Sequence, residues 1–304
     1  MHGDSHWVCP SCRQGLARGD QDFVCAAESL RFSTHHDIPD FILPSRRPEI
    51  DEFLRSYQKI RRSEQWGSEA IEYYLRLPYE DLTGKHQWIW NIRRKTYECF
   101  LTDFRQHAGS RSLTVADLGA GSCWLSHRLA KEGHHVLAVD INTDIHDGLG
   151  VLSRFPSLKN FQPIRAEFNF LPLTFASCDV MIFNSSLHYS NKPIELITKT
   201  LPFLKDRGIL YVLDSPMYNR PENGEIMISQ KIESFRKNHG IELPPKHAGS
   251  YLTFEVLANV GDALELTVLK PNYGVQWHGR RFMSRIFSGR EPAIFAVLKI
   301  RRRK

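Results

Sequence analysis

The sequence predicts an α/β fold in which a mostly parallel sheet carries helices on its faces. Between residues 113 and 214, apolar strand-like segments alternate with segments of helical spacing. Strands that are joined through helices pair in parallel, with right-handed crossovers. The chain has 304 residues, of which 41% are hydrophobic and 24% are charged. This length and composition suit one large domain with a substantial core and a small addition.

Three segments of different character divide the chain. Residues 1–46 contain short β-like pieces joined by turns, which predict a small N-terminal domain. Residues 47–110 carry apolar and aromatic residues at helical spacing, which predict several helices. Residues 111–304 carry the alternation of strands and helices and therefore predict the large domain.

The expected strands of the large domain are short apolar runs bounded by turns or helices. They lie at residues 113–118, 135–140, 161–166, 179–184, 208–214, 264–269 and 293–300. Helices are expected at 124–132 and near 193–204. The last two strands are close enough in the sequence to form an antiparallel edge pair, so we expect a seven-stranded sheet.

Composition limits the location and the partners of the protein. The chain has no apolar run of about 18 residues, and residues 1–12 lack the plan of a secretory signal, so we expect a cytoplasmic protein with no membrane partner. The six cysteines do not form a disulfide framework for a chain of this length, and we expect reduced thiols. A net charge of +6 suits an anionic partner such as RNA, although a basic C-terminal tail supplies part of it.

A glycine-containing turn after the first predicted strand is the strongest functional signal. Gly119 and Gly121 let the backbone approach a ligand at the carboxyl edge of the sheet. A dinucleotide fingerprint needs a third glycine where Trp124 stands. Asp117 would repel a pyrophosphate but attract the amino group and the sulfonium of S-adenosylmethionine. The sequence therefore favours S-adenosylmethionine, the alternative being that Asp117 only caps the turn.

With these residues, the chain resembles class I S-adenosylmethionine-dependent methyltransferases of the type 11, ubiquinone-biosynthesis-methyltransferase-like kind. The resemblance covers residues 111–215. The family's first motif, an acid followed by Gly-x-Gly-x-Gly, matches at Asp117, Gly119 and Gly121 and departs at Cys123. The resemblance implies a Rossmann-like sheet, S-adenosylmethionine as cofactor, and a methyltransferase activity.

Further matches follow in the family's order. Asp140 ends the second predicted strand, where a carboxylate can accept hydrogen bonds from both ribose hydroxyls. The resemblance implies that Glu167 and the backbone amide of Phe168 bind adenine, and that Asn184 ends the fourth strand beside the cofactor. Residues 184–187 do not form the Asn/Asp-Pro-Pro-aromatic run of many base amino-methyltransferases. This weighs against an adenine or cytosine amino group as the acceptor.

Three residues are candidates for catalysis. Methyl transfer is an in-line displacement, so the protein mainly aligns the acceptor and excludes water, and a base is needed only for a hydroxyl or a protonated amine. His188 is the best-placed candidate base, with Tyr189 beside it to line the pocket. Asp214, at the end of the fifth strand, is a second candidate base. Alternatively, His188 only forms hydrogen bonds within its loop.

Cysteines near the N-terminus have the spacing of a metal site. Cys9, Cys12 and Cys25 resemble the ligands of the small zinc-ribbon-like domain that precedes many such methyltransferases, including ribosomal RNA guanine methyltransferases. The expected fourth ligand after Cys25 is missing, because Glu28 and Ser29 stand there. Either His35 or His36 completes a zinc site, or the ribbon holds no metal.

Three interpretations of the function remain open. A small molecule is favoured by the resemblance and by the aromatic residues of the segment 64–96, which is expected to act as a lid over the cofactor or simply to pack against the sheet. RNA is favoured by the ribbon and the basic charge. A binding module without catalysis is the third alternative.

Overall fold

The computed structural model describes residues 7–240, 242–258, 264–275 and 287–303, and the single residues 277, 279, 281 and 283. The rest of the predicted 1–46 and 111–304 segments lies outside the described residues. Within the described part, no helix combines the length and the apolar character that a membrane span requires.

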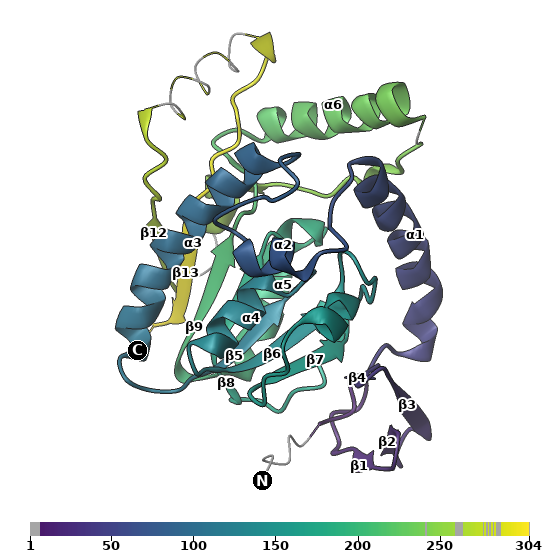
Figure 1. Ribbon diagram of the computed structural model, residues 1–304. Helices are drawn as coiled ribbons and strands as arrows, with labels where there is room; N and C mark the ends of the chain where they lie inside the picture. The colour runs from purple at the N-terminus through teal and green to yellow at the C-terminus, as the bar shows by residue number, and fades with distance from the viewer. Residues whose placement is uncertain are drawn as a thin grey trace.

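A seven-stranded sheet forms the centre of the molecule, in the order β12-β13-β9-β8-β5-β6-β7 (Figure 1). β13 is antiparallel to both of its neighbours, and the pairs from β9 to β7 are parallel. The fold class and the antiparallel edge pair that the sequence predicts are confirmed. The strands are β5 (Thr114–Leu118), β6 (His135–Asp140), β7 (Phe161–Arg165), β8 (Cys178–Asn184), β9 (Leu204–Leu213), β12 (Leu264–Leu269) and β13 (Val297–Arg302).

Two strands differ in extent from the prediction. β9 begins at Leu204, before residue 208, because Cys178 pairs with Leu204 across an irregularity in the ladder between β8 and β9. β13 begins at Val297 and not at residue 293, because Ile294 pairs with Met217 outside the sheet. Apolar runs therefore located these strands, but pairing partners far along the chain set their ends.

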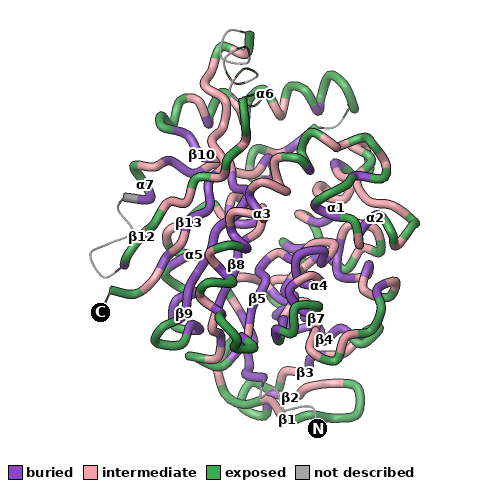
Figure 2. The backbone as a smooth tube through the Cα atoms, turned by 60° about the vertical axis from the view of Figure 1, so that its left-hand side comes forward, coloured by how far each residue is buried: buried purple, intermediate pink, exposed green. Residues whose placement is uncertain are grey.

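Helices cover both faces of the sheet. α2 (Ile71–Arg76), α3 (Gln87–Ala108) and α4 (Trp124–Lys131) share one hydrophobic cluster with the side chains of one face, and Phe104 of α3 is fully buried there. α5 (Pro193–Thr200) belongs to a second cluster on the other face. The central strands β5, β8 and β9 are buried along most of their length (Figure 2). Alternate side chains of each strand therefore stabilise a layer on either face.

The N-terminal residues form a small sheet of four strands, β1 (Ala17–Arg18), β2 (Asp22–Cys25), β3 (Leu30–His35) and β4 (Ile38–Pro39). This sheet lies against the free edge of β7, where the amide of Phe41 donates to the carbonyl of Arg165 at 2.8 Å. Phe41 is fully buried in the same hydrophobic cluster as α5. The small sheet and the large domain thus share one core.

Two helices lie at the carboxyl edge of the parallel strands (Figure 1). α1 (Arg47–Ser63) runs from the small sheet toward this edge, and α6 (Pro221–His239) lies beyond it. The sequence did not predict α6, because only Gly224 and Phe235 of that helix are buried and no apolar periodicity results. The short elements β10 (Met217–Tyr218), β11 (Leu252–Thr253) and α7 (Phe254–Ala258) complete this region.

Candidate cofactor site and active site

The turn between β5 and α4 has a left-handed backbone at three positions. The φ angles are +79° at Gly119, +52° at Gly121 and +61° at Cys123. Cys123, which stands where the family has its third glycine, therefore adopts the conformation that favours glycine, at a cost of about 1 kcal/mol. Its thiol is fully buried and donates to the carbonyl of Gly121 at 3.4 Å.

The two glycines of this turn have different surroundings. A Cβ atom at Gly119 would lie 2.4 Å from Cβ of Ser186, because the loop after β8 packs directly on the turn. A Cβ atom at Gly121 would meet nothing within 4 Å. Gly119 is therefore required by packing within the protein, whereas Gly121 leaves open space in which a ligand can approach the backbone.

Asp117 is a fully buried carboxylate with one free oxygen. Its Oδ2 accepts a hydrogen bond of 2.6 Å from Ser126 Oγ, whereas its Oδ1 has no hydrogen-bond partner in the described part of the chain. Burial raises the pKa of Asp117 to about 7. An unsatisfied buried carboxylate oxygen is unfavourable unless a cationic or hydrogen-bonding ligand meets it. The amino group of S-adenosylmethionine fits this requirement.

Asp140 holds the neighbouring position at the end of β6. Its Oδ2 accepts the amide of Gly121 and its Oδ1 accepts the amide of Asn142, each at 2.8 Å. Burial raises the pKa of Asp140 to about 6. Each oxygen keeps acceptor capacity after these bonds, so the carboxylate is still able to accept hydrogen bonds from two hydroxyls.

The remaining predicted cofactor residues lie at the same edge of the sheet. Phe168 packs edge-on against Phe183 of β8, with ring centroids 5.5 Å apart, and its ring tip approaches Gly119. Asn184 is partly exposed at the end of β8. The carboxylate of Glu167 is held by Arg46, whose Nη2 and Nε donate at 2.7 and 3.0 Å. The predicted adenine contact of Glu167 would thus compete with an ion pair.

His188 lies in a short 3-10 turn, Leu187–Tyr189, that follows β8. Its Nδ1 is buried without a hydrogen-bond partner among the described residues. Burial and then the charges of Lys231 and Arg93 lower the pKa of His188 to about 3. The imidazole is therefore neutral at pH 7 and has an unused nitrogen.

Tyr189 and Asp214 complete the predicted catalytic set. The ring of Tyr189 contacts Phe53 and Tyr57 of α1 edge-on, at centroid distances of 5.9 and 5.8 Å. Asp214 follows β9 in a left-handed conformation with φ of +50°, and its Oδ1 has no partner within the described residues. Burial raises the pKa of Asp214, and the charge of Arg93 opposes this shift.

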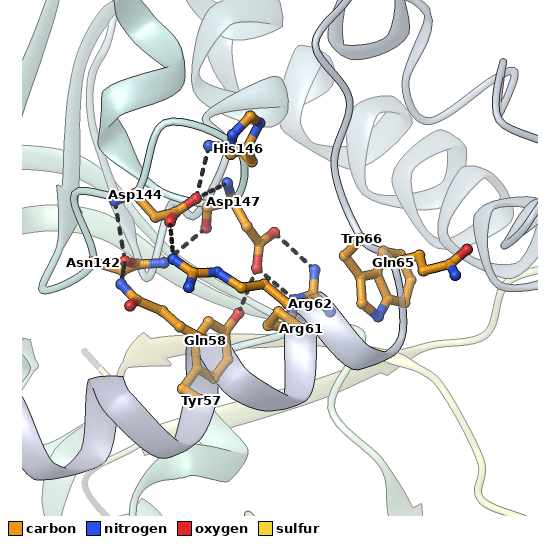
Figure 3. A pocket seen from close by; sticks show the side chains of 10 residues that line it. All are labelled: Tyr57, Gln58, Arg61, Arg62, Gln65, Trp66, Asn142, Asp144, His146 and Asp147. Atoms are coloured by element: carbon orange, nitrogen blue, oxygen red, sulfur yellow. Dashed lines mark hydrogen bonds and ion pairs between the residues drawn. The ribbon is translucent and has the colours of Figure 1, made fainter. Parts of the chain in front are cut away.

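Sequence reasoning missed the contribution of α1. Side chains of α1, of the residues just after it and of the segment after β6 line a cavity of about 200 Å³, which we call the lid cavity (Figure 3). Arg61 Nε and Nη2 donate to the two carboxylate oxygens of Asp147 at 2.5 and 2.8 Å, and Tyr57 also donates to Asp147. The lining residues are Tyr57, Gln58, Arg61, Arg62, Gln65, Trp66, Asn142, Asp144, His146 and Asp147.

The three predicted metal ligands come together in the small sheet. One Sγ atom each from Cys9, Cys12 and Cys25 lies within 4.8 Å of the others, and none of these cysteines forms a disulfide. No histidine or carboxylate joins this group in the described part of the chain. His35 instead shares a hydrogen bond of 2.9 Å with Ser33 Oγ. A fourth ligand from His35 is therefore not formed here.

Parts of the chain are similar to known proteins. Residues 116–212, from β5 to β9, match the family model of a methyltransferase domain. Similar solved structures include the YcgJ protein from Bacillus subtilis, with 11% identity, a TM-score of 0.49, and coverage of 68% of this chain and 100% of that chain. Another is the plantazolicin methyltransferase BpumL in complex with SAH, with 12% identity, a TM-score of 0.45, and coverage of 82% and 100%. No curated protein sequence matches the chain. On this match, residues 116–212 of the chain form a methyltransferase domain, and the protein is an enzyme.

Proposed function

We propose that the protein transfers a methyl group from S-adenosylmethionine to a small-molecule acceptor at the carboxyl edge of the sheet. The observation that carries this proposal is the free, buried Oδ1 of Asp117 beside the open side of Gly121. Asp117 lies near the end of β5 and Gly121 in the turn that follows, and the described residues neither bond this oxygen nor fill the space beside Gly121. A ligand with a cationic group and a polar body would satisfy them together.

The residues of this turn and its neighbours would hold the cofactor. Asp117 would pair with the amino group, Asp140 would accept from the ribose hydroxyls, and the 167–168 segment would contact adenine. When bound, S-adenosylmethionine supplies an electrophilic methyl group on a sulfonium. Its positive charge would also lower the pKa values that burial raises at Asp117 and Asp140.

The chain's own residues align the acceptor and exclude water. α1 covers the site through the contacts of Phe53 and Tyr57 with Tyr189, which place aromatic surface where water would otherwise enter. The neutral imidazole of His188 is available to accept a proton at Nδ1 from an acceptor hydroxyl or amine. Because the pKa of His188 is low, its basicity depends on the charges that surround it in the loaded site.

The covered position of these groups favours a small molecule over RNA. A folded nucleic acid would need α1 to move away before a base reached His188. The test is labelling with S-adenosylmethionine that carries a radioactive methyl group, in a cell extract that is split into small molecules and RNA. We expect label among the small molecules with the wild-type protein and none with Asp117→Asn. Label that appears in the RNA fraction and disappears after ribonuclease treatment would refute the proposal.

We also propose that Cys9, Cys12 and Cys25 bind one zinc ion, with a fourth ligand from outside this group. Three cysteine Sγ atoms within 4.8 Å of one another would supply three of the four donors of tetrahedral zinc. Metal analysis of the purified protein should find about one zinc per chain. A metal content near zero would refute zinc binding and support the alternative, a ribbon that holds no metal. The cytoplasmic location and the ubiquinone-biosynthesis-like subtype stay predictions.

A further inference from the structure

Arg93 is a cation in the interior of the site that forms no ion pair with the part of the chain that the structure describes. It lies on α3, deep among protein atoms, and the residue as a whole is only partly buried. Its Nη2 donates to Ser185 Oγ at 3.3 Å. Its guanidinium carbon lies 4.7 Å from the ring centroid of Trp90 and 5.4 Å from that of Trp66. Among the described residues, no carboxylate lies within 4.0 Å of it.

The charged groups around Arg93 do not neutralise it. Asp214 is the acid with the largest effect on Arg93, but it forms no ion pair with it. Arg61 and Asp147 are also near, and they are paired with each other. Lys231 of α6, which also faces His188, donates to the carbonyl of Ala248 at 2.8 Å. The region around His188 therefore carries two cations, Arg93 and Lys231, that form no ion pair with the described residues. The nearest acids that act on them are Asp214 for Arg93 and Glu64 for Lys231.

Arg93 is also held in a fixed position next to the lid cavity. Trp66, which lines that cavity, stacks on His86 with a centroid distance of 3.7 Å and contacts both Arg61 and Arg93. Ser185, which accepts from Arg93, follows β8 three residues before His188. A ligand group bound to Arg93 would thus lie between the lid cavity and the candidate base.

We infer that Arg93 binds a carboxylate of the methyl acceptor, so that the acceptor is a small carboxylic acid. The planar guanidinium presents paired donors that match a carboxylate, and a desolvated cation gains most from such a partner. The inference rests on the proposed function. It also gives His188 a role that depends on the acceptor, because an anion beside Arg93 would offset the charge that disfavours protonation of the imidazole.

The test uses a pair of probes of nearly equal shape. 4-Fluorobenzoate is an anion and 4-fluorobenzamide is its neutral counterpart, and ¹⁹F NMR measures the binding of each to the full-length protein with S-adenosylhomocysteine present. We expect the wild-type protein to bind the anion about tenfold or more tightly than the amide. Arg93→Gln should reduce this preference to about twofold or less, and Arg93→Lys should keep part of it because the charge remains. Arg94→Gln is the matched control, since Arg94 pairs with Glu98 on the same helix.

Each result decides the matter. Equal binding of both probes to the wild-type protein, or no binding of either, overturns the inference, and so does a preference that persists in Arg93→Gln. If that variant does not fold, a preference in Arg93→Lys as large as in the wild type overturns it instead. Calorimetry with S-adenosylhomocysteine separates this failure from that of the proposed function. A protein that binds the anion but not S-adenosylhomocysteine would refute the proposed function alone.

Discussion

Cofactor affinity should depend on pH mainly through the buried carboxylate with the higher pKa, Asp117. Burial raises the pKa of Asp117 to about 7 in the free protein. A cofactor amino group beside Oδ1 favours the charged form, so the pKa of Asp117 falls when the cofactor binds. Binding therefore releases a proton, and affinity rises with pH up to the pKa of the free protein and stays level above it.

The size of the effect follows from that pKa. At pH 5, which lies about two units below it, roughly 1% of Asp117 is ionised, so affinity should be about 100-fold lower than at pH 8, or about 2.7 kcal/mol. Calorimetry with S-adenosylhomocysteine between pH 5 and pH 8.5 measures this. Titrations in buffers of different ionisation enthalpy detect the released proton. Asp117→Asn should bind weakly at every pH, whereas Asp140→Asn should keep the dependence that Asp117 causes.

The same carboxylate makes a prediction for the protein without cofactor. The pKa of Asp117 in the folded state lies above its unfolded value of 3.8, so its contribution to stability is greatest below pH 3.8 and is lost as the pH rises toward 7. The loss amounts to about 4 kcal/mol. Asp117→Asn should therefore raise the melting temperature at pH 8 and change it little near pH 4. An affinity that is flat between pH 5 and pH 7, with no gain in stability for the variant, would refute this reasoning.

Three further predictions concern the turn and the candidate base. Gly119→Ala should destabilise the free protein by about 2–4 kcal/mol through the clash with Ser186. Gly121→Ala should destabilise it by only about 1 kcal/mol but should weaken cofactor binding at least tenfold. Denaturation measures the two stabilities, and calorimetry measures the two affinities. The Cys123→Gly variant should be more stable than the Cys123→Ala variant by about 1 kcal/mol in urea denaturation. The reverse order would show that the left-handed backbone is not maintained. With a pKa of about 3, His188 should remain neutral at pH 5 in ¹⁵N NMR of the imidazole, and a titration near pH 6.5 would contradict its burial.

The sequence predicts the sheet well because its signals are local. A strand of a parallel sheet is buried on both faces and reads as a continuous apolar run, which holds for β5, β6 and β8. α6 was missed because it buries so little, although Pro221 at its start and Gly240 after its end are ordinary helix boundary signals. The docking of the small sheet on β7 depends on contacts between residues far apart in sequence, and no local pattern encodes them.

The residues of the candidate site also differ in how well the sequence alone predicts them. Asp117 and Asp140 end strands and stand beside glycines, so the sequence marks them directly. Arg93 and Arg94 are adjacent in sequence and identical in type, and only the rotation of α3 directs the first inward and leaves the second paired with Glu98. The partner of Glu167 lies 121 residues earlier, at Arg46, which no spacing rule connects to it. Roles that arise from packing between distant helices therefore could not be predicted from the sequence.

The charges of the site are arranged in two regions along one edge of the sheet. At the ends of β5 and β6, the buried acids Asp117 and Asp140 require a cation, and burial raises their pKa values until one arrives. Near the ends of β8 and β9, Arg93 and Lys231 disfavour protonation of His188. The cofactor is positively charged, so its binding alone makes His188 a still weaker base. An anionic acceptor reverses this effect, and the proton acceptor is therefore strongest only when both ligands occupy the site.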